Sequence, residues 1–193
     1  MDVSLSRPAG AVFLGGRHHP NREPSRVSMK AWQFILFALC AAPAGAAETI
    51  VGRASVIDAD TIEIRGERIR LNGIDAPESW QRCEDGAGGE YRCGKDAAAA
   101  LDAFLAASRP TSCIVVDHDR YRRAVADCVR ADGSSVNGWL VANGWAVDWV
   151  RYSHDRFASE QSSAQTKKLG IWRGQFQLPC MARAERTGNK PAC

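Results

Sequence analysis

The sequence predicts a mainly β, α+β domain in which a small barrel of five strands carries about three helices. Five short segments show the alternation or the β-branched content of strands, an Ala-rich helical segment lies between the third and fourth, and two further helical segments follow. This order is typical of a five-stranded OB-fold barrel with attached helices. The strand pattern alone also suits a small open α+β sheet, so that alternative stays open.

The first three predicted strands lie close together in the chain. Segment 48–58 (ETIVGRASVID) is rich in β-branched residues, and segments 61–65 (TIEIR) and 68–74 (RIRLNGI) alternate at period two. Gly66 and Glu67 join the last two segments. A two-residue link with glycine at its first central position predicts a tight hairpin.

The remaining elements follow in a simple order. The Ala-rich segment 94–108 has Leu and Phe at helical spacing and predicts a helix. Later segments are assigned by the same patterns: strands at 111–117 and 123–133, a short helix with a Ser cap and a Gly stop at 134–144, an extended segment at 145–152, and a last helix at 155–170. Beyond Arg173 the chain is weakly patterned and is expected to wrap the surface.

An export signal is expected before the folded domain. Residues 29–46 (MKAWQFILFALCAAPAGA) show a lysine, an apolar run and a final Ala-Gly-Ala, the layout of a cleaved secretory signal peptide. The apolar run is too short to span a bilayer. Residues 1–28 are polar and without periodicity, which predicts a non-structural leader or a misassigned start, with translation beginning at Met29.

The folded part is expected to span residues 47–173, with a disulfide-stapled tail at residues 174–193. That length buries one modest core. Residues 1–46 hold five of the 25 Lys and Arg and two of the 22 Asp and Glu, so 20 of each sign remain. The mature net charge is near zero and gives no argument for a nucleic-acid partner, which local sites would have to supply.

Six cysteines follow the signal segment. An even number in a small exported chain predicts disulfides and a periplasmic or secreted location. Geometry favours one pairing, because two pairs bracket a short loop or a two-stranded turn and the last pair would close the tail. A four-cysteine zinc site is the rival, but no C-x2-C pair exists. The expected pairs are Cys83 with Cys93, Cys113 with Cys128, and Cys180 with Cys193.

Carboxylates gather at the open end of the predicted hairpin, where like charges repel unless a cation, arginines or solvent offset them. A loop at 66–67 sets Asp58 opposite Asp75 and places Asp60 diagonally from Asp75, all on the face of the apolar residues. Oxygen ligands so placed could share a hard cation such as Ca²⁺. The alternative is that the D-x-D pattern belongs to an ordinary turn or helix cap.

The same strand parity separates Arg70 from the acids. It places Arg70 on the face opposite Asp60, beside Glu63. Two readings stay open: either the long side chain curls round the strand end or a bulge changes the register, or Arg70 makes only a cross-strand surface pair with Glu63.

Three motifs occur in order and at fitting separations: VIDADT at 56–61, RIRLNGIDAPE at 68–78 and DRYRRAVAD at 119–127. The segments GKDAAAAL, LVANGWAVDWVRY and AQTKKLGIW extend the pattern. Together they resemble the staphylococcal nuclease (thermonuclease) family over about residues 49–172. The leader, the loop between Cys83 and Cys93, and the C-terminal tail lie outside the resemblance.

The resemblance implies a Ca²⁺-dependent endonuclease, a hydrolase that cleaves DNA and RNA to 3′-phosphate and 5′-hydroxyl products. It implies that Asp60, Asp75 and the backbone carbonyl of Ala76 bind the calcium ion, where many relatives have Thr in place of Ala. It further implies that Glu78 positions or deprotonates the attacking water. The two arginines that grip the scissile phosphate correspond to Arg70 and Arg123.

The resemblance also implies residues that contact nucleotides. Tyr121 matches one such tyrosine and Tyr152 a second. Arg122 stands where relatives often have Gly, so the loop carrying Arg123 is open to a different shape. The substrates implied are single-stranded or unpaired DNA and RNA, and the protein is expected to be a monomer without a membrane span.

The residue types suit phosphodiester cleavage. Charge builds on the non-bridging oxygens in the transition state, and a planar guanidinium can hold two of them, which lysine cannot. A calcium ion adds Lewis-acid stabilisation. A carboxylate such as Glu78 can hold a water in line and take its proton.

Two other functions remain as alternatives. One is a catalytically silent OB-fold module that binds single-stranded nucleic acid or a protein. The other is a structural periplasmic domain whose acids bind calcium for stability. The complete set of site residues argues against the silent module, since silent relatives usually lose some of them: Asp60, Arg70, Asp75, Glu78 and Arg123.

Other chemistry-bearing residues have simpler explanations. His118 and His154 are expected at turns or on the surface, and Lys167-Lys168 on a solvated helix face. The tryptophans at 139, 145, 149 and 172 are expected to pack in the core or between helices, although Trp149 could stack on a base. Asp58 either supports the acids or is a plain turn residue.

Overall fold

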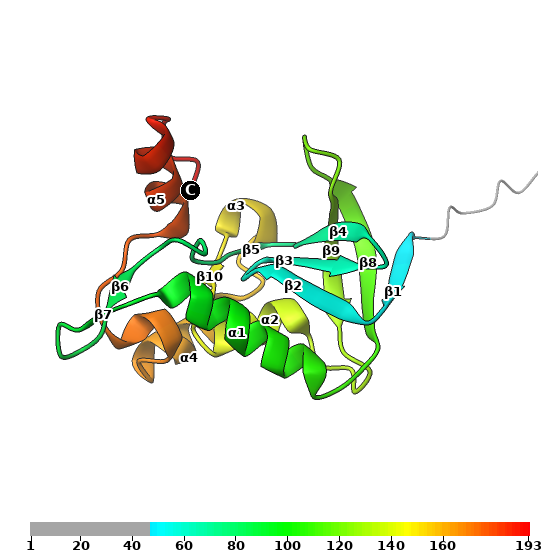
Figure 1. Ribbon diagram of the computed structural model, residues 1–193, viewed down its shortest axis with the longest axis horizontal. Helices are drawn as coiled ribbons and strands as arrows, with labels where there is room; N and C mark the ends of the chain where they lie inside the picture. Colours follow the sequence, from blue (N-terminus) through cyan, green and yellow to red (C-terminus); the bar gives the residue numbers. More distant parts are fainter. Residues whose placement is uncertain (1–46) are drawn as a thin grey trace, which may run out of the picture. The chain divides into compact units, whose positions relative to one another are not determined.

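The computed structural model of the protein describes residues 47–193, and the expected leader and signal peptide lie outside these residues. Six strands form the main sheet in the order β1-β8-β9-β4-β3-β2 (Figure 1). Neighbouring strands are antiparallel except β4 and β9, which are parallel. The strands are β1 (Thr49–Gly52), β2 (Ala54–Asp58), β3 (Thr61–Ile64), β4 (Glu67–Leu71), β8 (Thr111–His118) and β9 (Ala124–Val129).

The two edge strands of this sheet are consecutive in the chain. Only Arg53 separates β1 from β2, yet β1 pairs with β8 and β2 pairs with β3. One bent segment therefore lies on both edges and curls the sheet. Counted as one bent strand, β1 and β2 complete the five strands that the sequence predicts. The fold is α+β, with a curled half-barrel sheet and several helices, as the OB-fold prediction requires.

Two small sheets flank the barrel. Strand β5 (Ile74–Asp75) pairs with β10 (Val147–Asp148), and β6 (Cys83–Glu84) pairs with β7 (Glu90–Tyr91). The first of these pairs holds Asp75 opposite Val147, so the chain that follows β4 is fixed to a segment more than 70 positions away.

Three predicted helices are confirmed within a few residues: α1 (Cys93–Ala106), α2 (Val136–Ala142) and α4 (Ala158–Thr166). Ser135 caps α2 by accepting a hydrogen bond from the Gly138 amide. The prediction of an extended segment at 145–152 is only partly right. After β10 the chain turns into the short helix α3 (Val150–Ser153), and the 3₁₀ turn η1 (Gly170–Arg173) ends the region of the resemblance.

The sequence analysis assigned no helix to the weakly patterned tail, but the tail forms helix α5 (Pro179–Thr187). Pro179 lies in its first turn, and Gly188 follows with φ of 68°. Proline near the start and glycine just past the end are the usual ends of a helix. In Figure 1 this red helix stands beside β5 and α3.

The core lies between the barrel and α1. Four residues of the β3–β4 hairpin are at most 1% exposed, and α1 contacts β2 with its buried face toward the same cluster. Burying each Ile or Leu contributes about 1.5–3 kcal/mol. This core fixes the hairpin whose open end carries the acids. The hairpin residues are Ile62, Ile64, Ile69 and Leu71, and the α1 residues are Ala97, Leu101 and Leu105.

The predicted hairpin loop is wrong by one position. The turn residues are Arg65 and Gly66, with φ of 55° and 85°, and Ile64 pairs with Glu67. Two positive φ values are typical of a type I′ turn, which matches the twist of the strands. Here Arg65 adopts the left-handed conformation that glycine or asparagine usually supplies.

The correction shifts the register by two residues, so each side chain keeps its predicted face. Ile62 now pairs with Ile69, and both are buried. The predicted opposition of Asp58 and Asp75 is wrong. Asp58 pairs with Thr61 across a bulge, whereas Asp75 belongs to the separate β5–β10 sheet.

All three expected disulfides are present: Cys83–Cys93, Cys113–Cys128 and Cys180–Cys193, with 10, 15 and 13 residues of sequence separation. Cys113 and Cys128 lie directly opposite each other on β8 and β9. Such disulfides are typical of proteins outside the cytoplasm. Within residues 47–193, no helix is both long and apolar enough to cross a membrane.

Candidate active site

An open cleft of about 280 Å³ lies at one end of the barrel. It brings together residues from the β2–β3 turn, β4, the segment after β5, the β8–β9 loop and α5. A larger hollow of about 490 Å³ lies between β6–β7 and the chain before α5, and it contains none of the predicted site residues. The cleft is lined by Ile57, Asp58, Asp60, Thr61, Arg68, Arg70, Glu78, Arg123 and Arg183.

Arg70 joins the two acids that were expected to bind an ion. Its Nη2 atom lies 2.9 Å from Oδ2 of Asp60 and 3.4 Å from Oδ1 of Asp75. One cationic nitrogen therefore faces both carboxylates, and their oxygens converge on a common point. The alternative, in which Arg70 pairs with Glu63 on the surface, is not what the structure shows.

The end of strand β3 explains how Arg70 reaches Asp60. Arg70 lies directly opposite Thr61, the first residue of β3, and Asp60 precedes that strand in a turn. Strand alternation therefore holds only from Thr61 onward and does not decide on which side the Asp60 side chain lies. The long arginine side chain passes the strand end to meet the carboxylate, as one of the two readings anticipated. The Thr61 hydroxyl donates a hydrogen bond to Oδ1 of Asp60 and fixes the other oxygen.

Asp75 is the most deeply buried acid of the site, with 1% of its surface exposed. Burial raises the pKa of its carboxyl group, and the charge of Asp60 raises it further, while hydrogen bonds and charge from Arg183 and Arg70 act in the opposite direction. Its ionised form thus depends on cations held against it.

Asp58 lies in the same cleft and is half-buried. Burial raises the pKa of its carboxyl group, and the charges of Asp60 and Glu78 add to this increase. Its Oδ1 atom accepts a hydrogen bond from the Ala59 amide. Asp58 therefore stabilises the local turn and also lines the cleft together with Asp60 and Glu78.

Glu78 is positioned by its backbone. Its amide donates to Oε1 of Gln81, and its carbonyl accepts from the Gln81 amide at 2.7 Å. The first turn of α1 lies directly against the same carbonyl, since a Cβ atom added to Gly94 would come within 1.7 Å of it. The backbone of Glu78 is thus clamped between Gln81 and α1.

Arg123 reaches the cleft from the β8–β9 loop. Its amide donates to Oδ1 of Asp119 at 2.9 Å, and its Nε donates to Oδ2 of Asp119 at 2.6 Å. Arg122 has φ of 65°, the left-handed region that glycine adopts without strain. The arginine therefore takes the backbone conformation expected of glycine at this position, and the loop brings Arg123 to the same cleft as Arg70.

The two tyrosines lie outside the cleft on exposed surface. Tyr121 is 67% exposed, and the guanidinium carbons of Arg120 and Arg123 lie 4.9 and 5.7 Å from its ring centroid. Tyr152 is 50% exposed on α3 and meets Trp149 edge to face, with ring centroids 4.6 Å apart. Both are available to a ligand, and Tyr121 is next to a site arginine.

The ring of Trp149 lies beneath two arginines of the site, Arg70 and Arg183. The guanidinium carbons of Arg70 and Arg183 lie 5.4 and 5.7 Å from its ring centroid. Trp139 and Trp145 pack on the main core, and Trp172 on a smaller cluster, as expected. His118 and His154 are exposed, and so are Lys167 and Lys168.

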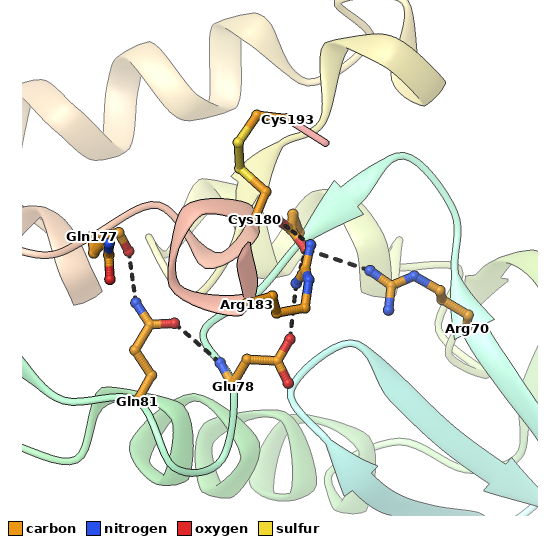
Figure 2. Close-up of a disulfide and its surroundings, with 8 residues drawn as sticks. Arg70, Glu78, Gln81, Gln177, Cys180, Arg183 and Cys193 are labelled. Carbon is orange, nitrogen blue, oxygen red and sulfur yellow. Dashed lines mark hydrogen bonds and ion pairs between the residues drawn. A yellow bond between two sulfur atoms is a disulfide. The ribbon is translucent and has the colours of Figure 1, made fainter. Parts of the chain in front are cut away.

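Arg183 is the site residue that the sequence did not suggest. Figure 2 shows it extending from α5 toward Glu78, with the guanidinium of Arg70 nearby. Its Nη1 atom lies 2.8 Å from both Oδ1 of Asp75 and Oε1 of Glu78, and its Nη2 atom lies 3.0 Å from Oδ2 of Asp75. Burial alone would lower the pKa of this guanidinium, but the hydrogen bonds and charges of Asp75 and Glu78 outweigh burial and raise the pKa.

A family model described as "Staphylococcal nuclease homologue" matches residues 68–174, more than half of the chain. The matched span contains β4 from its second residue onward, the acids after it, and the loop that carries Arg123. The chain belongs to the staphylococcal nuclease family.

Named relatives of this staphylococcal nuclease homologue have different descriptions. The chain is 49% identical over 191 residues to the succinoglycan biosynthesis protein ExoI of Rhizobium meliloti (strain 1021), covering 98% of this chain and 100% of that protein. It is 31% identical over 130 residues to an uncharacterized endonuclease of Escherichia coli O157:H7, covering 64% and 77%. It is 29% identical over 161 residues to endonuclease YhcR of Bacillus subtilis (strain 168), covering 75% of this chain and 13% of that protein.

The donor set of this staphylococcal nuclease homologue fits a hard divalent ion. Asp60 and Asp75 offer only oxygen, and they already surround one cationic nitrogen of Arg70. Ala76 is buried beside Asp75. As the side chains stand within residues 47–193, no three or more His, Cys, Asp or Glu side chains group closely enough to hold an ion. Guanidinium groups occupy the space between the acids.

Proposed function

We propose that this chain is an exported Ca²⁺-dependent nuclease that hydrolyses phosphodiester bonds of DNA and RNA to 3′-phosphate products. One observation carries the proposal: Asp60, Arg70, Glu78 and Arg123 line a single cleft, with Asp75 buried next to Arg70. Membership of the staphylococcal nuclease family supports the same reaction, and two relatives are named as endonucleases.

In this proposal Arg70 and Arg123 bind the scissile phosphate. Both guanidinium groups open onto the cleft and both are aligned by carboxylates, Arg70 by Asp60 and Arg123 by Asp119. Two planar forks, one from strand β4 and one from the β8–β9 loop, can hold the non-bridging oxygens as their charge increases. Because these carboxylates hold both guanidinium groups beforehand, little reorganisation is needed during the reaction.

Glu78 is the proposed general base. Its carboxylate opens onto the cleft, while its backbone is clamped by Gln81 and α1. A carboxylate held in this way can orient a water molecule in line with the phosphorus–oxygen bond that breaks and accept its proton. Asp60, Asp75 and the Ala76 carbonyl would hold Ca²⁺, which supplies Lewis-acid stabilisation of the phosphoryl oxygens.

The substrate surface suits unpaired strands. Tyr121 and Tyr152 expose half or more of their surface near the site, and exposed aromatic rings stack on bases that are not in a duplex. We therefore propose single-stranded or unpaired DNA and RNA as substrates of a monomeric enzyme. Three disulfides support a periplasmic or secreted location.

The relative named for succinoglycan biosynthesis covers almost the whole chain. That name gives a process and not a reaction. The site described above has the residues for phosphodiester hydrolysis, so the proposal concerns this reaction, whichever process it serves. The same fold without cleavage, as a nucleic-acid-binding or calcium-stabilised module, is the alternative that the experiment separates.

A gel assay with purified protein on denatured DNA and on RNA tests the proposal, in Ca²⁺ or in EGTA. Cleavage that requires Ca²⁺ and is lost in Glu78→Gln supports a nuclease. Glu185→Gln is the matched control, because this glutamate lies on α5 and contacts Gln177 outside the cleft. Retention of DNA without cleavage would support a silent binding module, and a calcium-dependent rise in Tm with neither would support a structural role.

A further inference from the structure

The tail helix supplies a cation to the acids of the site. Arg183 contacts both oxygens of Asp75 and one oxygen of Glu78, all within 2.8–3.0 Å. It lies beyond residue 174, where the family match ends. Its position is therefore a property of this chain's own C-terminal segment.

These contacts occupy the accessible side of Asp75. Only 1% of Asp75 is exposed, so a ligand can reach its carboxylate only from the direction in which the guanidinium groups approach. Arg183 covers both oxygens, and Arg70 adds a longer contact at 3.4 Å. A calcium ion needs oxygens at about 2.3–2.6 Å. At that distance from Asp75 a divalent cation would lie against the positive charges of both guanidinium groups, so its binding requires Arg183 to move away.

From this geometry we propose that Arg183 is an internal counter-cation that holds Asp75 and Glu78 together until a divalent ion displaces its guanidinium. The inference rests on the proposed function for the identity of the ion. The acids exchange one cation for another, so neither is left buried without a partner, which would be costly. Displacement also releases Oε1 of Glu78, the group proposed to bind water.

The anchoring of the tail allows this exchange without loss of the helix. The chain before α5 is fixed by two hydrogen bonds to its carbonyl groups. The Gln81 side chain donates from Nε2 to the Gln177 carbonyl, and the Glu84 amide donates to the Gln175 carbonyl. The Cys180–Cys193 disulfide, drawn in Figure 2, ties the chain end back to α5. Arg183 is 31% exposed, so its side chain has a path into solvent.

Calcium binding measured by isothermal titration calorimetry tests the proposal in the full mature chain. Arg183→Gln removes the competitor and should lower the Kd for Ca²⁺ by about tenfold, the worth of one charge-assisted contact that no longer has to break. Arg186→Gln is the matched control. It removes the same charge one turn away, from a residue that stacks on Trp80 and contacts no site acid.

Arg183→Lys tests whether calcium must displace the guanidinium fork, or whether the positive charge at this position weakens calcium binding from a distance. Lysine keeps the charge but cannot cover both oxygens of Asp75 as a planar fork does. If calcium displaces the guanidinium, the Kd for Ca²⁺ of this variant should lie between those of the wild type and Arg183→Gln. If only the positive charge matters, the Kd should equal the wild-type value. This variant also keeps the proposal open to refutation if Arg183→Gln does not fold.

Thermal denaturation gives a second readout that does not depend on activity. In EGTA, Arg183→Gln should have a lower Tm than Arg186→Gln, and saturating Ca²⁺ should abolish or reverse the difference. Unchanged calcium affinity in both Arg183 variants, or weaker binding, overturns the inference, and so does a wild-type chain that binds no Ca²⁺. If calcium-dependent cleavage persists while affinity is unchanged, only this inference fails. If Arg183→Gln binds Ca²⁺ more tightly than the wild type but neither the wild type nor any variant cleaves nucleic acid, the inference about Arg183 stands and the proposed function is overturned.

Discussion

The Nη2 atom of Arg70 lies 2.9 Å from Oδ2 of Asp60, although strand alternation assigns the two residues to opposite faces of their hairpin. The contact is possible because β3 begins only at Thr61, which leaves Asp60 in the turn before it. The catalytic arginine of the proposed mechanism is thus aligned by an acid of the proposed metal site. Changes to either residue are expected to disturb both phosphate binding and ion binding.

Replacing Arg70 by lysine should lower kcat for DNA cleavage by about 10²–10³, the cost of losing one preorganised donor to the transition state. The charge is kept, but the planar fork that can hold Asp60 and a phosphate oxygen together is lost. Initial rates at saturating substrate check this. Arg53→Lys is the control, since Arg53 is exposed between β1 and β2. Equal rates in both variants would contradict a phosphate-binding role for Arg70.

Gly94→Ala should reduce cleavage by roughly tenfold to a hundredfold, because a misplacement of about 1 Å in a catalytic group can cost that much. The new Cβ atom would lie 1.7 Å from the Glu78 carbonyl and push the proposed base away from the cleft. Rate measurements and Tm together show whether activity falls more than stability does.

Gly138→Ala is the matched control for this change. Gly138 also lies inside a helix, but its added Cβ would meet only side-chain atoms, the nearest at 3.3 Å. It should retain wild-type activity. If Gly94→Ala is as active as Gly138→Ala, the clamp on Glu78 has no catalytic consequence.

Replacing Cys113 and Cys128 together by serine should lower the free energy of unfolding by about 2–4 kcal/mol, because this disulfide closes a loop across two central strands. Guanidinium denaturation followed by tryptophan fluorescence measures the change. The double variant of Cys180 and Cys193 should leave the barrel transition nearly unchanged, since that disulfide closes only the tail. A larger loss in the tail variant would show that α5 is needed for the barrel to fold.

Acid sensitivity should depend in part on Asp132. The Arg130 side chain and the Ser134 amide lower the pKa of Asp132 from 3.8 to about 2. A lowered pKa contributes stability above pH 3.8 that is lost as the pH falls through 2. Asp132→Asn should therefore lose less Tm than the wild type between pH 5 and pH 2. An equal or steeper loss of Tm in the variant would contradict this assignment.

The sequence was sufficient where short-range pattern decides the structure. Alternation predicted which residues of the hairpin are buried, and a two-residue error in register did not change their faces because two is the period of a strand. The disulfides followed from cysteines placed across loops and opposed strands. The turn position was missed because Arg65 adopts a positive φ that its residue type does not suggest.

The arrangement of the site depends on contacts that pattern does not encode. Strand parity separates Arg70 from Asp60, and only the end of β3 brings them together. Arg183 lies in a weakly patterned tail, where the proline and glycine at the ends of α5 were the available signals of a helix. Its contact with Asp75 joins positions 108 residues apart, so no local signal could have shown it.

The disulfides of the described residues pair the first cysteine with the second, the third with the fourth and the fifth with the sixth, and none ties distant segments together. A chain that emerges into an oxidising compartment from its N-terminal end presents these cysteines in the same sequence. If each successive pair is oxidised as soon as both of its thiols have emerged, the native bonds form directly. Maturation of this protein is therefore expected to need an oxidant but no reshuffling of mispaired thiols.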